Sequence, residues 1–380
     1  MNEVPTSADV VVIGGGILGT CIALHTARET DARVVLLEQN YLGSGPTGRS
    51  LAVISQHYTN AALVTLARES LEIFRTFGDR YGGECGFVET GLVVLVGRDR
   101  DTELRDAVAM QQDCQVDVDL LGHEHLREVD DRLFLDDVAI ASYQPQAGYA
   151  DPLQTMAVLR QSAQAAGVEL CEGVRATEVM TSDSAVTGVK TRSGTVATPV
   201  VVDAAGPWAQ AIACSAGISI PLLPCRQIMA VLARSPQFGA PHVTVNDFVA
   251  GTSFRAAGHL TYVGWFDRSQ TDDPIDPDAY DESLPGDRLT ALAAAWQHRY
   301  PLGAKTTARW GGWSGAYDVT PDWMPICDRL GIEGFYACCG TSGHGFKFGP
   351  LLGHLMARWI ETGKRPRPEL EALRGDRFAN

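Results

Sequence analysis

The sequence predicts an α/β fold in which a Rossmann-like βαβ unit is combined with a second, mostly antiparallel α+β part. Residues 9–13 and 33–38 are apolar, β-branched runs typical of buried parallel strands, and residues 16–30 between them have helical spacing. Residues 215–310 alternate short apolar runs with turn residues, which is typical of an antiparallel sheet. A length of 380 residues fits two domains or one large unit with insertions.

The remaining elements follow from the same two periodicities. Leucine and phenylalanine recur on one face of 60–80, which predicts a helix, and 87–97 has the pattern of a hairpin. Further helices are expected at 153–166, 286–299 and 348–361, and strands at 168–179, 186–191, 199–205, Ile228–Leu232, Thr252–Arg255, His259–Trp265 and 334–338. The polar residues after Lys364 are expected to form a loose tail, 366–380.

Composition excludes several classes of protein. The formal net charge of −15 disfavours nucleic acid as a partner, because an acidic surface repels phosphate. The nine cysteines are scattered and have no CxxC or other metal-ligand spacing, so we expect reduced thiols, a cytoplasmic location and no metal. The N-terminus lacks a signal-peptide pattern, and no apolar run reaches the roughly 18 residues that predict a membrane span.

A glycine motif follows the first predicted strand and opens the first helix. Gly14-Gly-Gly16-Ile17-Leu18-Gly19 fits G-x-G-x-x-G in the context that dinucleotide binding requires. The first glycine makes the tight turn, the second lets the backbone approach a pyrophosphate, and the third allows close helix–strand packing. Glu38, at the end of the second strand, can accept hydrogen bonds from ribose hydroxyls. This unit predicts a dinucleotide but does not distinguish NAD from FAD.

Four later segments make that distinction. They are Gly43–Ser50, Val201–Trp208, Gly315–Asp322 with its Tyr-x-x-Thr-Pro-Asp core, and Gly340–Phe348 with Gly-His-Gly-Phe-Lys-Phe. Together with the N-terminal motif, they resemble the D-amino-acid oxidase-like family of FAD enzymes. The similarity is greatest to sarcosine oxidases, both the monomeric enzyme and the β subunit of the heterotetrameric one, and to dimethylglycine dehydrogenase.

The resemblance implies two interleaved domains. An FAD-binding domain would comprise 1–80, 141–215 and 310–365, and a substrate domain 81–140 and 216–309. The pyrophosphate would lie on the N-terminal glycine motif, and the loop that ends at Lys347 would lie against the flavin ring. The residues expected to contact FAD are Gly14, Gly16, Ile17, Leu18, Gly19, Glu38, Gln39, Ser44, Thr47, Gly48, Arg49, Ser50, Val174, Ala205, Gly206, Trp208, Gly315, Gly343, Gly345, Phe346 and Lys347.

Three departures from the family pattern alter these expectations. Gly315 occupies the position of the cysteine that links flavin covalently in monomeric sarcosine oxidase, so we expect non-covalent FAD. Thr261 and Tyr262 occupy the strand where sarcosine-type oxidases place an oxygen-activating lysine, so the electron acceptor is left open between oxygen and another acceptor. Ser55 replaces an arginine that grips the substrate carboxylate.

Six side chains are candidates for the substrate site. Lys347 retains the second carboxylate anchor of the family, and Arg255 is a candidate to replace the missing arginine; for each, the alternative is an ordinary charge, in a surface ion pair or between strands. His344 either tunes amine protonation or has a structural role beside two glycines. Tyr317 either lines the pocket or packs. His57 and Tyr58 follow the Ser55 position.

The resemblance implies oxidation of the C–N bond of an amine or N-substituted amino acid to an imine, with hydride transfer to flavin N5. Two alternatives remain open at this point. The chain could oxidise a C–O bond, as the 2-hydroxy-acid dehydrogenases of the same family do, or it could be a flavoprotein subunit without turnover of its own. Homo- and hetero-oligomers are both compatible with the sequence.

Overall fold

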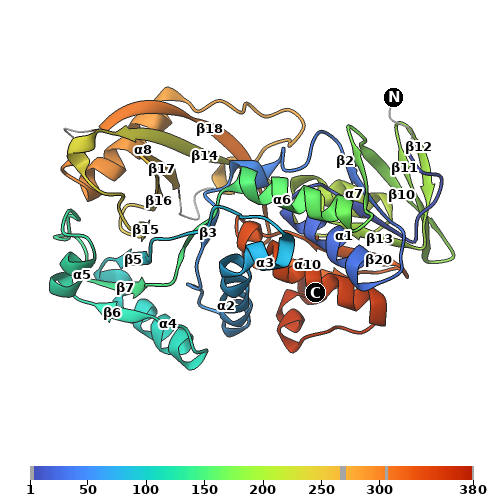
Figure 1. Ribbon diagram of the computed structural model, residues 1–380, viewed down its shortest axis with the longest axis horizontal. Helices are drawn as coiled ribbons and strands as arrows, with labels where there is room; N and C mark the ends of the chain where they lie inside the picture. Colours follow the sequence, from blue (N-terminus) through green and yellow to red (C-terminus); the bar gives the residue numbers. More distant parts are fainter. Residues whose placement is uncertain (1–3, 266–270, 304–306, 379–380) are drawn as a thin grey trace.

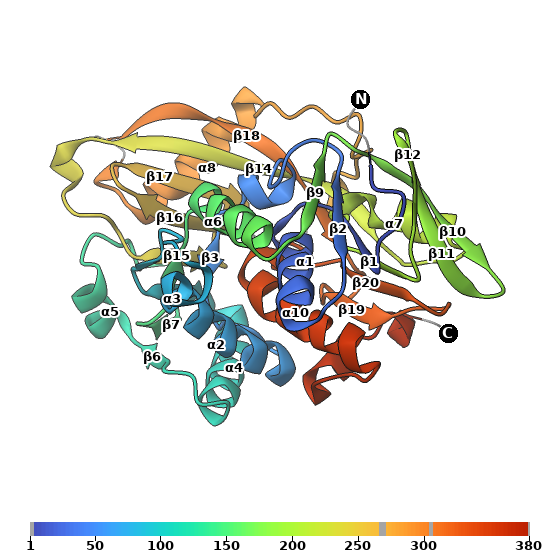
Figure 2. The same ribbon diagram turned by 45° about the vertical axis from the view of Figure 1, so that its right-hand side comes forward.

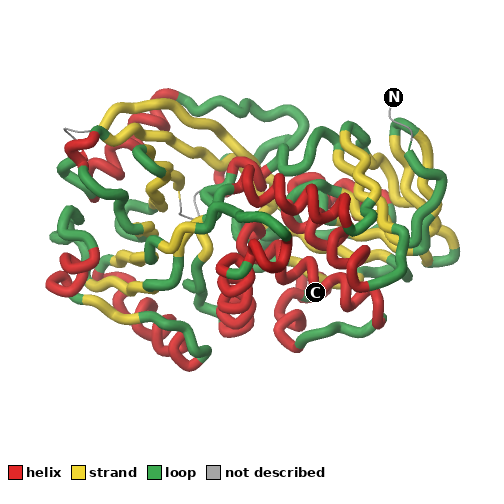
Figure 3. Tube along the Cα trace, viewed as in Figure 1, coloured by secondary structure: helices red, strands yellow, loops and turns green. Residues whose placement is uncertain are grey.

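The fold is built around two sheets that lie side by side with helices between and around them (Figures 1 and 3). The computed structural model describes residues 4–265, 271–303 and 307–378. The larger sheet lies toward one end of the molecule, and a small three-stranded sheet lies at the other (Figure 3). Among the described residues, no helix combines the length and the apolar character that crossing a bilayer requires.

The first sheet has six strands in the order β19-β20-β13-β1-β2-β9. Its neighbours run parallel except β19, which is antiparallel to β20. The strands are β1 (Val10–Ile13), β2 (Val34–Glu38), β9 (Glu169–Glu172), β13 (Val200–Asp203), β19 (Ile326–Arg329) and β20 (Phe335–Cys339). This parallel arrangement confirms the predicted βαβ unit.

Both faces of this sheet are covered, which explains why its strands are apolar throughout. Val10 and Val12 point into a core that they share with α1 (Ile17–Glu29) and α10 (Gly345–Thr362), whereas Val11 and Ile13 point into a second core. The second core includes a three-stranded sheet and α7. These elements are β10 (Ala176–Ser182), β11 (Ala185–Thr191), β12 (Gly194–Ala197) and α7 (Ala209–Ser215).

Helices α1 and α10 lie against each other (Figure 2). A Cβ on Gly349 would come within 2.8 Å of the Ile17 side chain, and one on Gly353 within 2.5 Å of Cys21 Cβ. Two glycines spaced one turn apart therefore let the helix backbones approach more closely than larger side chains permit. Pro350 lies inside α10 beside this contact.

The second sheet has eight strands in the order β18-β14-β17-β16-β15-β5-β7-β6. Every pair is antiparallel except β15 and β5. The strands are β5 (Leu92–Val96), β6 (Asp119–Leu121), β7 (Ile140–Gln144), β14 (Leu223–Arg234), β15 (Thr244–Asp247), β16 (Thr252–Ala257), β17 (Leu260–Trp265) and β18 (Thr307–Val319). Helix α8 (Gly286–Arg299) packs on one face, where fully buried Arg299 donates to Asp247 at 2.7 Å.

The remaining elements connect the two sheets. The described α-helices are completed by α2 (Ala61–Arg75), α3 (Phe77–Tyr81), α4 (Asp101–Asp113), α5 (His123–Val129) and α6 (Pro152–Ala165). A small antiparallel sheet consists of β3 (Val53–Ile54), β8 (Gly148–Tyr149) and β4 (Val88–Glu89). Its central strand β8 pairs Tyr149 with Val53, just before the Ser55 position.

One sequence-based expectation about strands needs correction. The predicted hairpin at 87–97 does not form: β4 pairs with β8, whereas β5 pairs with β7 and β15. Gly91, at φ +70°, redirects the chain from one sheet into another instead of closing a turn between adjacent strands. Strands β7 and β18 belong to the larger sheet, although the expected boundaries assign most of their residues to the FAD-binding domain.

The C-terminal segment is packed, so the expectation of a loose tail was wrong for the residues described. Leu370 and Leu373, in a 3-10 helix over Pro368–Leu373, are fully buried. Arg367 pairs with Glu69 of α2 at 2.9 Å, and Arg377 pairs with Asp322 at 2.8 Å. A few apolar side chains between charged ones were enough to anchor the segment. Residues 379 and 380 lie outside the described part of the chain.

We expect Leu370→Ala to lower the free energy of unfolding by about 2–5 kcal/mol, because it removes a fully buried side chain and leaves a cavity. Leu153→Ala is the control, since Leu153 is 72% exposed. Urea unfolding followed by tryptophan fluorescence measures both variants. Equal midpoints for the two variants would contradict a packed C-terminal segment.

Candidate active site

A cavity of about 850 Å³ lies where the two sheets meet. Its wall begins at the turn after β1 and the end of β2, continues along residues 44–51 and 204–208, and ends at β14, β18 and the loop before α10. The carboxyl ends of parallel strands and the face of an antiparallel sheet therefore share one elongated space, as ligand sites of α/β sheets commonly do.

The turn between β1 and α1 forms one end of the cavity. A Cβ on Gly14 would lie 2.4 Å from the Ala204 carbonyl oxygen, and one on Gly19 would lie 1.9 Å from the Gly14 carbonyl oxygen. Gly16 caps α1 without any side-chain hydrogen bond, and the Ile17 N–H donates to Thr47 Oγ1 at 3.1 Å. The start of α1 thus presents amide donors to the cavity, which is the requirement for binding a phosphate.

Glu38 lies beside this turn at the end of β2. Its carboxylate accepts hydrogen bonds from the Gly15 N–H at 2.7 Å and the Asn40 N–H at 2.8 Å. Burial raises the pKa of Glu38, and these hydrogen bonds partly oppose that effect. Because a carboxylate has about four lone-pair positions, Glu38 can still accept hydrogen bonds from a ligand hydroxyl.

Asp318 organises the opposite end of the cavity. Its carboxylate accepts from the Gly340 N–H at 2.7 Å and from Thr341 Oγ1 at 3.2 Å, while burial raises its pKa. Gly343 has φ +83°, and a Cβ there would lie 2.3 Å from the Tyr317 ring. The loop is therefore held flat against Tyr317, and α10 begins directly after it.

Most of the residues predicted to contact FAD line this cavity. They are Gly14, Gly16, Ile17, Leu18, Glu38, Gln39, Ser44, Thr47, Arg49, Ser50, Val174, Ala205, Gly206, Trp208, Gly315, Gly343, Gly345 and Phe346, and Tyr317 lines it too. Gly19, Gly48 and Lys347 do not. Gly19 and Gly48 instead allow close backbone contacts, since a Cβ on Gly48 would lie 2.5 Å from the Gly43 carbonyl oxygen.

Lys347, Tyr58 and His344 form a cluster behind the first turn of α10. Lys347 Nζ donates to Ser55 Oγ at 3.1 Å and lies 5.0 Å from the centre of the Tyr58 ring, which stacks edge-on against His344 at 5.3 Å. Burial lowers the pKa of Lys347 to about 7. Two positions that the sequence analysis compared with carboxylate anchors, Ser55 and Lys347, are thus in contact.

The two candidate histidines are half-buried and uncharged at neutral pH. Burial, aided by the Lys347 charge, lowers the pKa of His344 to about 3 and that of His57 to about 4. His344 Nδ1 has no hydrogen-bond partner among the described residues. His57 Nδ1 instead lies 3.3 Å from Gln111 Nε2, so this ring takes part in a buried polar network.

Arg255 is 6% exposed, so it is not a surface charge, whereas the alternative of a charge between strands stays open because Arg255 is paired with Tyr262 on the next strand. Its guanidinium lies between the rings of Tyr149 and Tyr262, 4.3 Å and 4.7 Å from their centres. Among the described residues, its Nε has no hydrogen-bond partner. Burial lowers its pKa, which is the mark of a cation short of compensating contacts. Tyr149 pairs with Val53, so Arg255 reaches the small sheet that leads to Ser55.

Four buried polar residues that adjoin the candidate site residues along the chain or by hydrogen bonds were not identified from the sequence. Asp203, at the end of β13, has its pKa raised to about 8 by burial, and its Oδ2 has no partner among the described residues. Its position as an acid ending an apolar strand, like Glu38, was a usable signal. Gln56, Gln111 and Gln144 form a buried hydrogen-bonded network that no local pattern could indicate.

The βαβ unit, the helix N-terminus and the acid at the end of β2 define a dinucleotide-binding protein whose cavity extends onto a second sheet. The chain belongs to the FAD dependent oxidoreductase family, known as DAO, which matches residues 9–359. These residues include every segment that lines the cavity.

The chain is also similar to individual members of known function. It is 28% identical over 391 residues to mitochondrial sarcosine dehydrogenase of Homo sapiens, covering 99% of this chain but 42% of that protein. It is 26% identical over 375 residues to sarcosine oxidase subunit beta of an Arthrobacter species, covering 94% of this chain and 88% of the subunit. Among solved structures, L-proline dehydrogenase from P. horikoshii superposes with a TM-score of 0.89 and 28% identity, covering 99% and 98% of the two chains.

Proposed function

We propose that this chain oxidises the C–N bond of an amine or N-substituted amino acid to an imine. The observation that carries the proposal is a pair of cations, half-buried Lys347 and buried Arg255, without ion pairs to carboxylates among the described residues. Charges removed from solvent normally have compensating partners, so two cations that lack an acidic partner among the described residues favour an anionic ligand group. Sarcosine and proline, named in relatives, are both secondary amino acids with a carboxylate.

The residues of the cavity fit FAD. The pyrophosphate would bind the amides at the start of α1, and a ribose would bind Glu38. A pyrophosphate at this place would explain why α1 has no side-chain cap and why Gly14 and Gly19 leave no room for a Cβ. The flavin ring would lie toward Tyr317 and the loop before α10, where a second helix N-terminus favours negative charge. FAD, when bound, accepts the hydride from the carbon beside the amine nitrogen.

The chain's own contribution is binding and orientation. Lys347 and Arg255 would hold the substrate carboxylate, which fixes the C–H bond relative to the cofactor and lowers the entropic cost of the reaction. The substrate amine must be uncharged, because an ammonium group has no lone pair. His344 and His57 are neutral at working pH, so they do not repel a positively charged amine before it loses its proton.

We also propose that FAD is bound non-covalently. No cysteine or histidine among the described residues lines the cavity, and Gly315 packs against the Arg49 side chain. After acid precipitation, we expect all of the yellow colour in the supernatant, because acid disrupts the fold and no covalent bond retains the cofactor. Absorbance of pellet and supernatant measures this, and a yellow pellet after repeated washing would contradict it.

We also propose a division into two domains, a cellular compartment and an oligomeric state. We place one domain around the six-stranded sheet and one around the eight-stranded sheet, with β7 and β18 in the second. Nine free cysteines support a reducing compartment such as the cytoplasm. One relative is by name a subunit of a larger enzyme, which supports assembly of this chain into an oligomer.

An anaerobic screen tests the proposed reaction. The FAD-loaded protein is mixed with primary and secondary amino acids, with amines that lack a carboxylate, and with matched 2-hydroxy acids. We expect secondary amino acids to bleach the flavin absorbance fastest, because the cations select a carboxylate and the reaction needs an amine lone pair. Admission of air then reports whether oxygen is the acceptor. Faster bleaching by hydroxy acids, or none by any compound, would reject the proposal.

Lys347→Met should lower kcat/KM for a carboxylate-bearing substrate roughly 10- to 100-fold, the value of one charge-assisted hydrogen bond. Since the pKa of Lys347 lies near 7, its cation is present below that pH and lost above it. The ratio of the wild-type kcat/KM to that of Lys347→Met should therefore fall as the pH rises from about 6 to about 9. Lys364→Met, at an exposed position, is the control. An advantage that does not change with pH, with FAD fully bound, would exclude the assigned role.

A further inference from the structure

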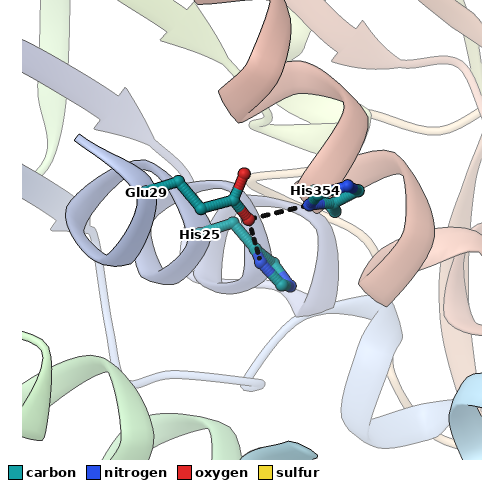
Figure 4. Close-up of side chains that lie close together, drawn as sticks. All are labelled: His25, Glu29 and His354. Atoms are coloured by element: carbon teal, nitrogen blue, oxygen red, sulfur yellow. Dashed lines mark hydrogen bonds and ion pairs between the residues drawn. The ribbon is translucent and has the colours of Figure 1, made fainter. Parts of the chain in front are cut away.

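Helices α1 and α10 bring three potential metal ligands together away from the cavity. His25 and Glu29 lie one turn apart on α1, and His354 faces them from α10 (Figure 4). Glu29 Oε1 lies 2.9 Å from His25 Nδ1 and 2.7 Å from His354 Nδ1. One ligand atom from each residue falls within 4.8 Å of the others.

The donor set is of the kind that transition-metal ions prefer. Two imidazole nitrogens and a carboxylate oxygen can occupy three positions around a Zn²⁺ ion, with water in a fourth. Both imidazoles crowd the same carboxylate oxygen, Oε1, while Glu29 Oε2 is buried and has no partner among the described residues. A buried carboxylate oxygen left unpaired is costly, and an ion bound between these groups would relieve that cost.

An ion can reach these three residues from solvent. His25 and His354 line a cleft of about 550 Å³, whose wall also includes Tyr81 and Pro350. The side chain of His354 is 45% exposed, whereas those of Glu29 and His25 are 22% and 15% exposed. The cleft leaves space for the water that an open coordination position needs.

The supporting contacts resemble those around known metal ligands. His25 Nε2 lies 3.1 Å from the Tyr81 hydroxyl, so the ring is oriented from its far side. The cluster is distinct from the cavity: His354 follows Gly345, the first residue of α10, by nine residues, or about 14 Å along the helix.

We propose that His25, Glu29 and His354 bind a divalent transition-metal ion, with Zn²⁺ as the representative, which joins α1 to α10. The ion takes no part in the proposed reaction. Its effect is to stabilise the contact between the two helices whose N-termini face the cavity. The proposal is independent of which substrate the protein oxidises.

Calorimetric titration with ZnCl₂ tests the site on FAD-loaded protein that has been treated with EDTA and desalted. We expect one Zn²⁺ per chain in the wild type and loss of that binding event in His354→Ala. Glu29→Gln keeps an oxygen for the histidines to contact but removes the charge. Since loss of an outer-shell partner already costs about 10- to 100-fold in affinity, loss of this ligand should cost at least as much.

His298→Ala is the matched control, because His298 also contacts a carboxylate, Asp137, at 2.8 Å but joins no three-ligand cluster among the described residues. It should bind Zn²⁺ like the wild type. FAD content and circular dichroism show whether each variant is folded. If His354→Ala is not folded, the Zn²⁺ affinity of Glu29→Gln tests the proposal instead. Absence of stoichiometric binding to the wild type, or unchanged affinity in folded His354→Ala or Glu29→Gln, would overturn the proposal.

Discussion

The close contact between α1 and α10 is the constraint on which the rest of the structure depends. Gly349 and Gly353 allow the helix backbones to touch at Ile17 and Cys21, where side chains of any size would force them apart. Both helices start at the cavity, so their separation fixes the spacing between the two helix N-termini that face it. A cofactor whose pyrophosphate and redox ring are separate parts of one extended molecule needs this spacing to be constant.

Burial shifts the pKa values of the ionisable groups around the cavity toward their uncharged forms. Lys347 and Arg255 are cations without acidic partners among the described residues, and burial makes each easier to neutralise. The nearby acids Asp203 and Asp318 are also harder to ionise, because burial raises their pKa values. Burial thus disfavours the charged form of all four groups, so a substrate anion would gain most from a cation that is left without another partner.

Sequence reasoning predicted those features that depend on neighbouring residues. The strand, glycine turn and helix around Gly14–Gly19, and the acid Glu38, are local patterns whose physical causes act within one βαβ unit. The pairing of β4 with β8 was not predictable, because two-residue strands carry no periodicity. The cluster of His25 with His354 was equally hidden, since cysteine and histidine spacing detects only ligands that are close in sequence. The family motifs indicated that Lys347 and the Ser55 position belong to one site, but they did not indicate the distance between the two side chains.

One strand links the two binding surfaces without a break. β18, the edge strand of the larger sheet, pairs with β14 along the whole of that strand, and near its end Tyr317 and Asp318 support the loop before α10. A covalently continuous, hydrogen-bonded strand resists stretching, so this sheet cannot slide relative to the loop as a hinged domain would. Alignment of substrate and cofactor is thus a property of the chain's connectivity, and changes in specificity are most easily accommodated by side chains on the sheet face, where they leave this alignment intact.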